Sequence, residues 1–373
     1  MPKKLISLIL SFIITLSVFA EEKTDSVSSH YKIPKSWFVV PAGFYMEETS
    51  VGLGLTGGYY FKSNSLDKIS SISGSVFYTM LNQVKINLNS RSYFADNKVY
   101  LNGNVNLRHY VEHYYGISND IGNLVGVENH NIYTSQIFDV KLEPFYNFTD
   151  DISLGLYVGA RGERMVEFNE QLQLNVEECK QRFGTAGWDD YFMLGLGAQF
   201  MYDSRDNGFY PQKFSNFLKV SALTYNKALG SSFSFTSLKL DCRQYIPTWL
   251  GQVFAWQVKF ETNLGEEIPF QMLSTVGGSD NLRGIRERKF IDNSMFECQL
   301  EYRIPIWWRL KAAVFCSVGD VFDINNPSIV KPKIGYGIGG RFRLNQARVN
   351  LRVDLTGNNY GEWKFYITAT EAF

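Results

Sequence analysis

The sequence predicts an all-β fold, namely a transmembrane antiparallel β-barrel of roughly 16 strands, an even number as such barrels require. Polar and apolar residues alternate in many segments of about 10–13 residues, the length that a tilted strand needs to cross a membrane. The chain begins with a segment typical of export, and its expected connections are long at one end of the barrel and short at the other. These features favour a barrel over a soluble sandwich, whose strands are shorter.

The first 20 residues have the pattern of a signal peptide. Two lysines precede an apolar run that ends in the small residue Ala20. We expect cleavage after Ala20, because the run is short for a membrane anchor. The expected organisation is a signal peptide at 1–20, a short periplasmic segment at 21–36 and a β-barrel at 37–373.

The composition limits the classes of partner and site. The 373 residues include 37 basic and 37 acidic side chains, so the formal net charge is zero and nothing favours nucleic acid. Aromatic residues make up 16% of the chain, which suits strands. The four cysteines, and three histidines near one expected loop (His109, His113 and His130), lack the spacing of metal ligands. We therefore predict no enzyme activity, no cofactor and no metal.

The alternation predicts which side chains face lipid and which face the lumen. From Ala347 to Thr356, every second residue is apolar, and the residues between them are Arg348, Asn350, Arg352, Asp354 and Thr356. In a barrel the apolar face contacts lipid and the polar face lines the lumen. The sheet must also close, because an open edge leaves unpaired backbone groups in hydrocarbon.

Sixteen segments carry this pattern. A change of phase between Phe235 and Leu238 suggests a bulge in one of them. The longer connections, near 111–131, 162–189, 264–290 and 319–332, all fall on one side, which we interpret as extracellular. The expected strands lie near 37–46, 51–62, 68–80, 82–92, 97–110, 132–147, 150–161, 190–203, 215–227, 231–245, 250–263, 291–305, 308–318, 333–345, 346–356 and 362–373.

The last segment resembles the sorting strand of outer-membrane barrels. Phe365 and Ile367 alternate with polar residues, and the aromatic Phe373 stands last. Glu371 departs from that signal, which has an aromatic or apolar residue there. Cys298 and Cys316 are expected to stand opposite each other on neighbouring strands, as two free thiols or as a disulfide.

Four motifs follow one another between about Tyr191 and the end of the chain. A loop motif consists of Leu282, Arg283 and Gly284; a strand reading EYRIP begins at Glu301; and a strand end reading FCSVGDVFD begins at Phe315. The fourth motif is an expected periplasmic turn made of Asp203, Arg205, Asp206, Asn207 and Pro211. Together they resemble the BamA/TamA superfamily of outer-membrane assembly factors, also called bacterial surface antigens.

The resemblance implies that the Arg283 loop folds back into the barrel and meets acidic residues on its wall. The alternation independently places Glu301 on the lumen face, so we expect a bidentate pair between Arg283 and Glu301. The family's second acidic residue falls at Ser317 in this chain. Asp320 or Asp323 is expected to replace it, unless the loop is held less firmly.

Two functional hypotheses follow. In the first, the barrel lies in the outer membrane of a Gram-negative-type bacterium and helps to insert or translocate proteins or lipids at a weakly closed seam between its first and last strands. In the second it is a passive pore or structural barrel, and the lumen residues Arg341, Arg343, Arg348 and Arg352 favour anions. The segment 21–36 is too short for a periplasmic POTRA domain, so we expect a barrel-only relative. The expected partners are outer-membrane lipid, unfolded outer-membrane protein clients and a separate periplasmic protein, with the barrel itself monomeric.

Overall fold

The structure is a computed structural model that describes residues 36–46, 50–63, 68–120, 132–168, 186–329, 331–343, 348–369 and 371–373. The expected signal peptide, Cys179 and His130 lie outside the described residues. No helix among the described residues is long and apolar enough to cross a membrane.

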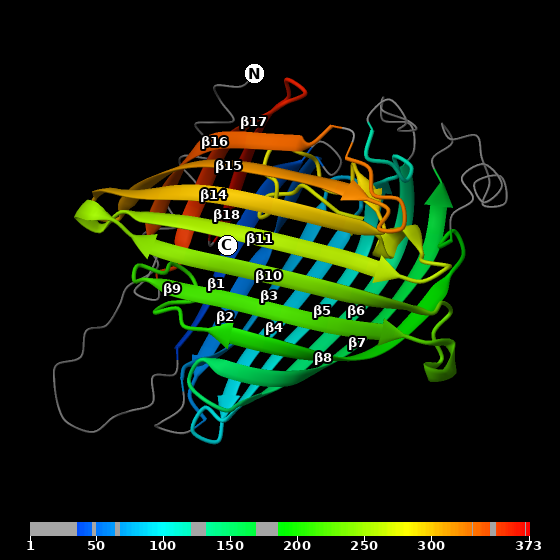
Figure 1. Ribbon diagram of the computed structural model, residues 1–373, viewed down its shortest axis with the longest axis horizontal. Helices are drawn as coiled ribbons and strands as arrows, with labels where there is room; N and C mark the ends of the chain where they lie inside the picture. The colour runs from blue at the N-terminus through cyan, green and yellow to red at the C-terminus, as the bar shows by residue number, and fades with distance from the viewer. Residues whose placement is uncertain are drawn as a thin grey trace.

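One antiparallel sheet of 16 strands makes up most of the molecule, which confirms the predicted all-β class and strand number. Each predicted segment overlaps one strand of this sheet. Most ends differ by at most four residues, but the strand predicted at 150–161 continues to Phe168, into the expected connection 162–189. In Figure 1 the sheet curls round, so that the strands coloured blue to cyan form the wall behind β10 and β14. The strands of this sheet are β1 (Ser36–Met46), β2 (Ser50–Phe61), β3 (Ser70–Thr79), β4 (Val84–Phe94), β5 (Val99–His113), β6 (Ile132–Asn147), β7 (Ile152–Phe168), β8 (Tyr191–Asp203), β9 (Ser215–Tyr225), β10 (Phe235–Pro247), β11 (Val253–Leu264), β14 (Ser294–Trp307), β15 (Leu310–Phe322), β16 (Lys333–Arg343), β17 (Asn350–Asn358) and β18 (Trp363–Ala369).

The strands follow one another in sheet order, with β1 and β18 at its two ends. Among the described residues no backbone ladder joins β1 to β18. The connections divide into two sets because neighbouring strands are antiparallel. We call the end with the connections after β5, β7, β11 and β15 the long-loop end, and the opposite end the short-turn end.

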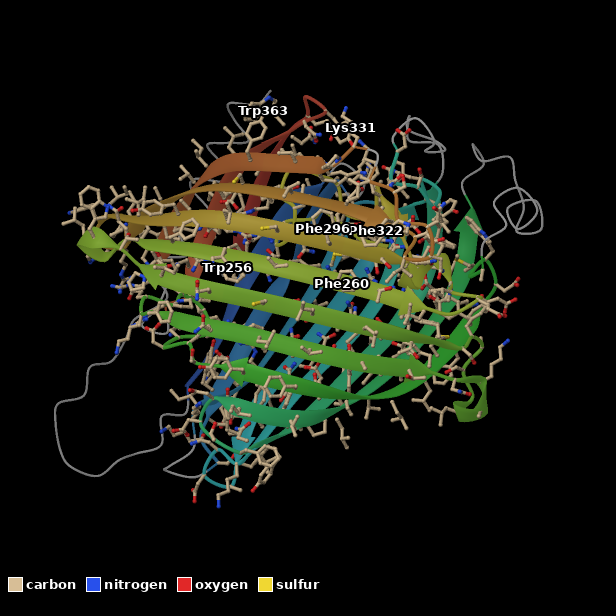
Figure 2. All side chains as sticks on the ribbon, in the orientation of Figure 1. Trp256, Phe260, Phe296, Phe322, Lys331 and Trp363 are labelled. Carbon is tan, nitrogen blue, oxygen red and sulfur yellow. The ribbon has the colours of Figure 1, made fainter. Side chains whose placement is uncertain are left out.

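The two faces of the strands differ as the alternation predicts. In β17, Asn350, Arg352 and Asp354 are buried inside the barrel, whereas Leu355 points outward and is 45% exposed. Figure 2 shows Trp256, Phe260 and Phe296 on the near wall, where β11 and β14 pair. Apolar side chains on this outer face match a lipid environment, and polar ones fill the interior.

Aromatic residues also fill the lumen at the long-loop end, and this explains one error in the sequence analysis. Phe235 points inward and packs in a buried cluster with Tyr225 and Phe270. Leu238 points outward, so an apolar lumen residue caused the apparent change of phase. The ladder between β9 and β10 runs from Phe235 to Tyr245 without a shift, and the predicted bulge is absent there. Shifts occur instead at Thr134/Ser135 and near Pro305.

Short elements outside the large sheet shape three connections. The 3-10 helices η3 (Lys227–Leu229) and η4 (Trp249–Gly251) lie in the connections after β9 and β10. The long connection between β11 and β14 contains η5 (Phe270–Met272) and a small hairpin of β12 (Ser274–Thr275) and β13 (Ile291–Asp292). This hairpin brings the two ends of segment 276–290 together and directs it into the barrel.

Candidate functional site

The segment 276–290, here called the inner loop, enters the lumen from the long-loop end. Its residues Leu282 and Ile285 are buried in a cluster with Val321 of β15 and with Tyr115, which lies just beyond the end of β5. Apolar contacts therefore hold the loop on both sides of Arg283. The guanidinium of Arg283, which is 1% exposed, extends beyond this cluster toward β14 and β17.

Two carboxylates receive the guanidinium of Arg283. Its Nη2 lies 2.9 Å from Glu301 Oε2 as an ion pair, and its Nη1 donates a hydrogen bond of 3.0 Å to Asp354 Oδ2. The carbon atom of the guanidinium also lies 3.5 Å from the centre of the Phe315 ring, a cation–π contact. The contact with Glu301 is as expected, but the expected bidentate geometry is wrong, because Arg283 divides its donors between two strands.

The residues expected to replace the second carboxylate have other contacts. Ser317 Oγ donates to the carbonyl oxygen of Gly335, at 3.4 Å. Asp320 is buried and pairs with Lys333 near the long-loop end. Asp354 was missed, although the alternation had placed it on the lumen face. Its proximity to Arg283 depends on how deeply the inner loop enters the lumen, which no local pattern in the sequence encodes.

Three further arginines complete a buried network around these carboxylates. Arg341 contacts Asp354 at 2.5 Å and Glu301 at 3.4 Å, while Arg303 donates to Glu301 at 2.8 Å. Arg352 lies 3.4 Å from Asp354. We call the set Arg283, Glu301, Arg303, Arg341, Arg352 and Asp354 the lumen network.

The lumen network is close to charge balance. Arg341 also binds Glu371 at 2.7 Å, and Arg352 binds Asp280 at 2.6 Å. Four guanidinium groups thus meet four carboxylates. Buried charges tolerate loss of water only when they are paired in this way. The pairing also weakens the argument for an anion-selective lumen, because nearby carboxylates compensate the charges of Arg341 and Arg352.

Two glycines allow the backbone of the inner loop to approach the wall. Gly284 has φ = +102°, a conformation that favours glycine. Gly335 in β16 faces the carbonyl oxygen of Arg283, and a Cβ atom at position 335 would lie 2.0 Å from that oxygen. Any larger residue at 335 must therefore displace the loop or the strand.

The turn between β8 and β9, residues 204–214, contains the other motif. Arg205 donates two hydrogen bonds of 2.8 Å to the carboxylate of Asp203, and Asn207 Oδ1 accepts from the backbone N–H groups of Phe209 and Tyr210. Pro211 is buried. These local bonds give the turn a defined shape.

This turn also extends across the short-turn end. Asp206 accepts a hydrogen bond of 2.6 Å from Arg348, which precedes β17. The buried ring of Tyr210 lies 3.3 Å from Nζ of Lys311 and 5.3 Å from the guanidinium of Arg303. Burial opposes ionisation of Asp206, but the bonds from Arg348 and two backbone N–H groups outweigh it and lower the pKa of Asp206.

The final strand agrees with the prediction only in part. Phe365 and Ile367 point outward and are 60% and 43% exposed. Phe373 does not continue this face: β18 ends at Ala369, and Phe373 is buried inside the barrel with Tyr245. The prediction that Phe373 ends an alternating strand is therefore wrong. The ring of Phe373 packs against apolar side chains inside the lumen instead of facing lipid.

Cysteines and candidate metal ligands have no special arrangement in the described part of the chain. Cys242, Cys298 and Cys316 are free thiols. Cys316 stands opposite Leu300 rather than opposite Cys298, because the turn after β14 is displaced from the expected position. Within the described ranges no group of three His, Cys, Asp or Glu side chains could hold a metal ion.

Comparisons with known proteins agree with this architecture. A family model described as the Omp85 superfamily domain matches residues 60–373. No curated protein matches the sequence. Among solved structures, BamA from Haemophilus ducreyi lacking POTRA domains 1–3 is similar with a TM-score of 0.60 and 14% identity, over 98% of this chain and 78% of that one.

Two other solved structures are similar over most of this chain. They are CdiB from Acinetobacter baumannii (TM-score 0.56, 11% identity, 90% of this chain) and CdiB from Escherichia coli (TM-score 0.56, 7% identity, 93% of this chain). The chain spans 59% and 64% of their respective lengths. At such low identity, these likenesses demonstrate a shared fold.

Proposed function

The chain belongs to the Omp85 superfamily, a family of outer-membrane barrels, and on that basis we propose that it assists the insertion or translocation of outer-membrane proteins or lipids. The observation that carries this proposal is the inner loop, anchored through Arg283 to Glu301 and Asp354. Arg283 and Glu301 also belong to the motifs that carry the resemblance in the sequence. The proposal assigns no catalytic step to the chain.

The seam between β1 and β18 supplies the mechanism. β18 has 7 residues and β1 has 11, and each ends the sheet. A strand at a sheet edge presents unpaired N–H and C=O groups, which can template pairing with another chain. In the proposed function a client strand adds to this edge, because backbone pairing replaces contacts that lipid cannot provide.

The inner loop supports the wall next to the seam. Arg283 joins β14 to β17, and β17 pairs with β18. If the seam opens, β18 can move while β17 stays in place through its contact with the loop. The charges in the lumen network then keep the remaining wall together, since separating a buried pair is costly.

The orientation of the barrel follows from its two ends. We propose that the long-loop end is extracellular and the short-turn end periplasmic, the usual arrangement of bacterial barrels. Export would require cleavage of the proposed signal peptide after Ala20. We propose an unfolded outer-membrane protein as the client, with a separate periplasmic protein as a candidate partner and outer-membrane lipid as the surroundings of a monomeric barrel.

The proposed function can be tested in proteoliposomes. A urea-unfolded, unrelated barrel is diluted into vesicles with and without this protein, and its folding is followed by its mobility on a gel without heating. The proposal expects faster folding in the vesicles that contain the protein. Equal rates, with this protein folded in the bilayer, would contradict the proposal and favour a passive pore or structural barrel.

A further inference from the structure

The last three residues leave the sheet and enter the lumen near the short-turn end. β18 ends at Ala369, and Glu371, Ala372 and Phe373 are buried. A continued strand would have placed Phe373 in lipid, together with Phe365 and Ile367. The wall must therefore offer contacts that compete with lipid for an aromatic ring and with water for a carboxylate.

The wall provides a separate subsite for each end of this tail. Arg341 Nε and Asn350 Nδ2 donate hydrogen bonds of 2.7 and 2.6 Å to the two carboxylate oxygens of Glu371. Both oxygens are thus satisfied by side chains from β16 and β17. These bonds explain why Glu371 departs from the sorting pattern. An apolar side chain at this position could not accept the hydrogen bonds of Arg341 and Asn350.

The second subsite receives Phe373. Its ring packs in a cluster with Tyr245, Val253 and Ala255 from β10 and β11. Arg303 donates a hydrogen bond of 2.9 Å to the main-chain oxygen of Phe373, and its guanidinium lies 5.4 Å from the centre of the ring. The tail therefore bridges strands from two parts of the barrel wall.

Both subsites are in direct contact with the anchor of the inner loop. Arg341, which binds Glu371, also binds Asp354 and Glu301. Arg303, which binds Phe373, also binds Glu301. Asp354 and Glu301 are the two carboxylates that hold Arg283.

We infer that this part of the lumen wall is a binding site for a peptide segment of the type acidic–small–aromatic, occupied by residues 371–373. Glu371 is a positioning residue that orients Arg341 toward the carboxylates of the Arg283 anchor. When residues 371–373 occupy the site, they stabilise the inner loop indirectly, through Arg341 and Arg303. This inference concerns contacts within the barrel and does not rest on insertion activity.

Trypsin provides a direct readout of the inner loop. Arg283 is buried, so the bond after it is protected while the anchor is intact. Glu371→Gln keeps the shape of the side chain and removes its charge, and Phe373→Ala empties the aromatic subsite. Glu371→Gln weakens charge-assisted hydrogen bonds, and Phe373→Ala removes the packing of a buried ring. Each change is therefore expected to increase the cleavage rate after Arg283 about tenfold. Phe365→Ala, on the outer face of β18, is the matched control and should leave the rate unchanged.

Binding of a peptide is tested with a barrel that lacks residues 371–373. A synthetic peptide of residues 368–373 should restore protection after Arg283 in a saturable manner. The same peptide with Gln in place of Glu371 should restore much less. A barrel that folds normally but is cleaved at the wild-type rate without its tail would overturn the inference, as would rescue that is equal for the two peptides.

A measurement on a chain that keeps Glu371 and Phe373 covers the case in which these variants fail to fold. Cysteines replace Ala255 and Ala372 in a protein without its native cysteines, and a short bifunctional maleimide is added. Efficient crosslinking is expected because both residues belong to the buried cluster of Phe373. Absence of crosslinking in the folded barrel would show that the tail does not occupy the site.

Discussion

Asp354→Asn isolates the electrostatic part of the inner-loop anchor. The amide has nearly the shape of the carboxylate but no charge. Asp354 accepts a bond from Arg283 at 3.0 Å and contacts Arg341 at 2.5 Å and Arg352 at 3.4 Å. The substitution leaves four buried guanidinium groups with three carboxylates, so one positive charge is uncompensated.

The expected loss of stability is large for one substitution. Removing one member of a buried ion pair costs about 3–5 kcal/mol. If the whole cost appears as opening of the loop, the open population rises by roughly 100- to 4000-fold, because each 1.4 kcal/mol is about a factor of ten. Asp190→Asn is the control: Asp190 and Arg164 form an exposed pair at 3.8 Å, and such pairs contribute about 0–1 kcal/mol.

Two assays separate local opening from global unfolding. Denaturant titration of the barrel in vesicles, followed by tryptophan fluorescence, measures global stability, and trypsin cleavage after Arg283 measures loop opening. Asp354→Asn should accelerate cleavage strongly or shift the unfolding midpoint, and Asp190→Asn should do neither. If Asp354→Asn matches the wild type in both assays, Asp354 does not anchor Arg283 and the reasoning fails.

Three other predictions follow from particular contacts. Gly335→Val should expose the inner loop to trypsin, because a Cβ at this position would lie 2.0 Å from the Arg283 carbonyl oxygen; unchanged protection would contradict that close approach. The pKa of Asp206 is lowered in the folded protein, so its pairing with Arg348 stabilises turn 204–214 above the ordinary aspartate pKa of 3.8 and is lost as the pH falls through the folded value. A fluorophore on this turn should therefore become more mobile in acid, whereas in Asp206→Asn the mobility should be high and insensitive to pH. Cys316 is an exposed thiol on the outer face and should react with a membrane-soluble maleimide without prior reduction; a reduction-dependent reaction would indicate a disulfide.

The strands could be predicted because their signal is local. Alternation with a period of two depends only on which face meets lipid, and each of the 16 segments carries it. The hairpin of β12 and β13 was missed, since each of its strands has 2 residues and is too short to show a period. Phe235 misled the prediction because an aromatic residue inside the lumen looks like a lipid-facing one.

The contacts of the site were harder to predict than its residues. Arg283, Glu301 and Asp354 could all be placed on the lumen side from the motif and the alternation. Which carboxylate meets Arg283 depends on the depth of the inner loop and on the stagger between distant strands. The inward path of Phe373 depends on Arg303, which is 70 residues away in the chain, and that of Glu371 depends on Arg341, which is 30 residues away. Local sequence patterns do not encode contacts between residues so far apart in the chain.

The central claim is that the anchored inner loop supports insertion, and Arg283→Ala tests it most directly. The folding rate of an unrelated barrel is measured in vesicles with equal amounts of folded wild type, Arg283→Ala or the control Arg164→Ala, whose side chain is 73% exposed. The account predicts that the wild type and Arg164→Ala accelerate folding and that Arg283→Ala does not. Equal acceleration by all three proteins would contradict it.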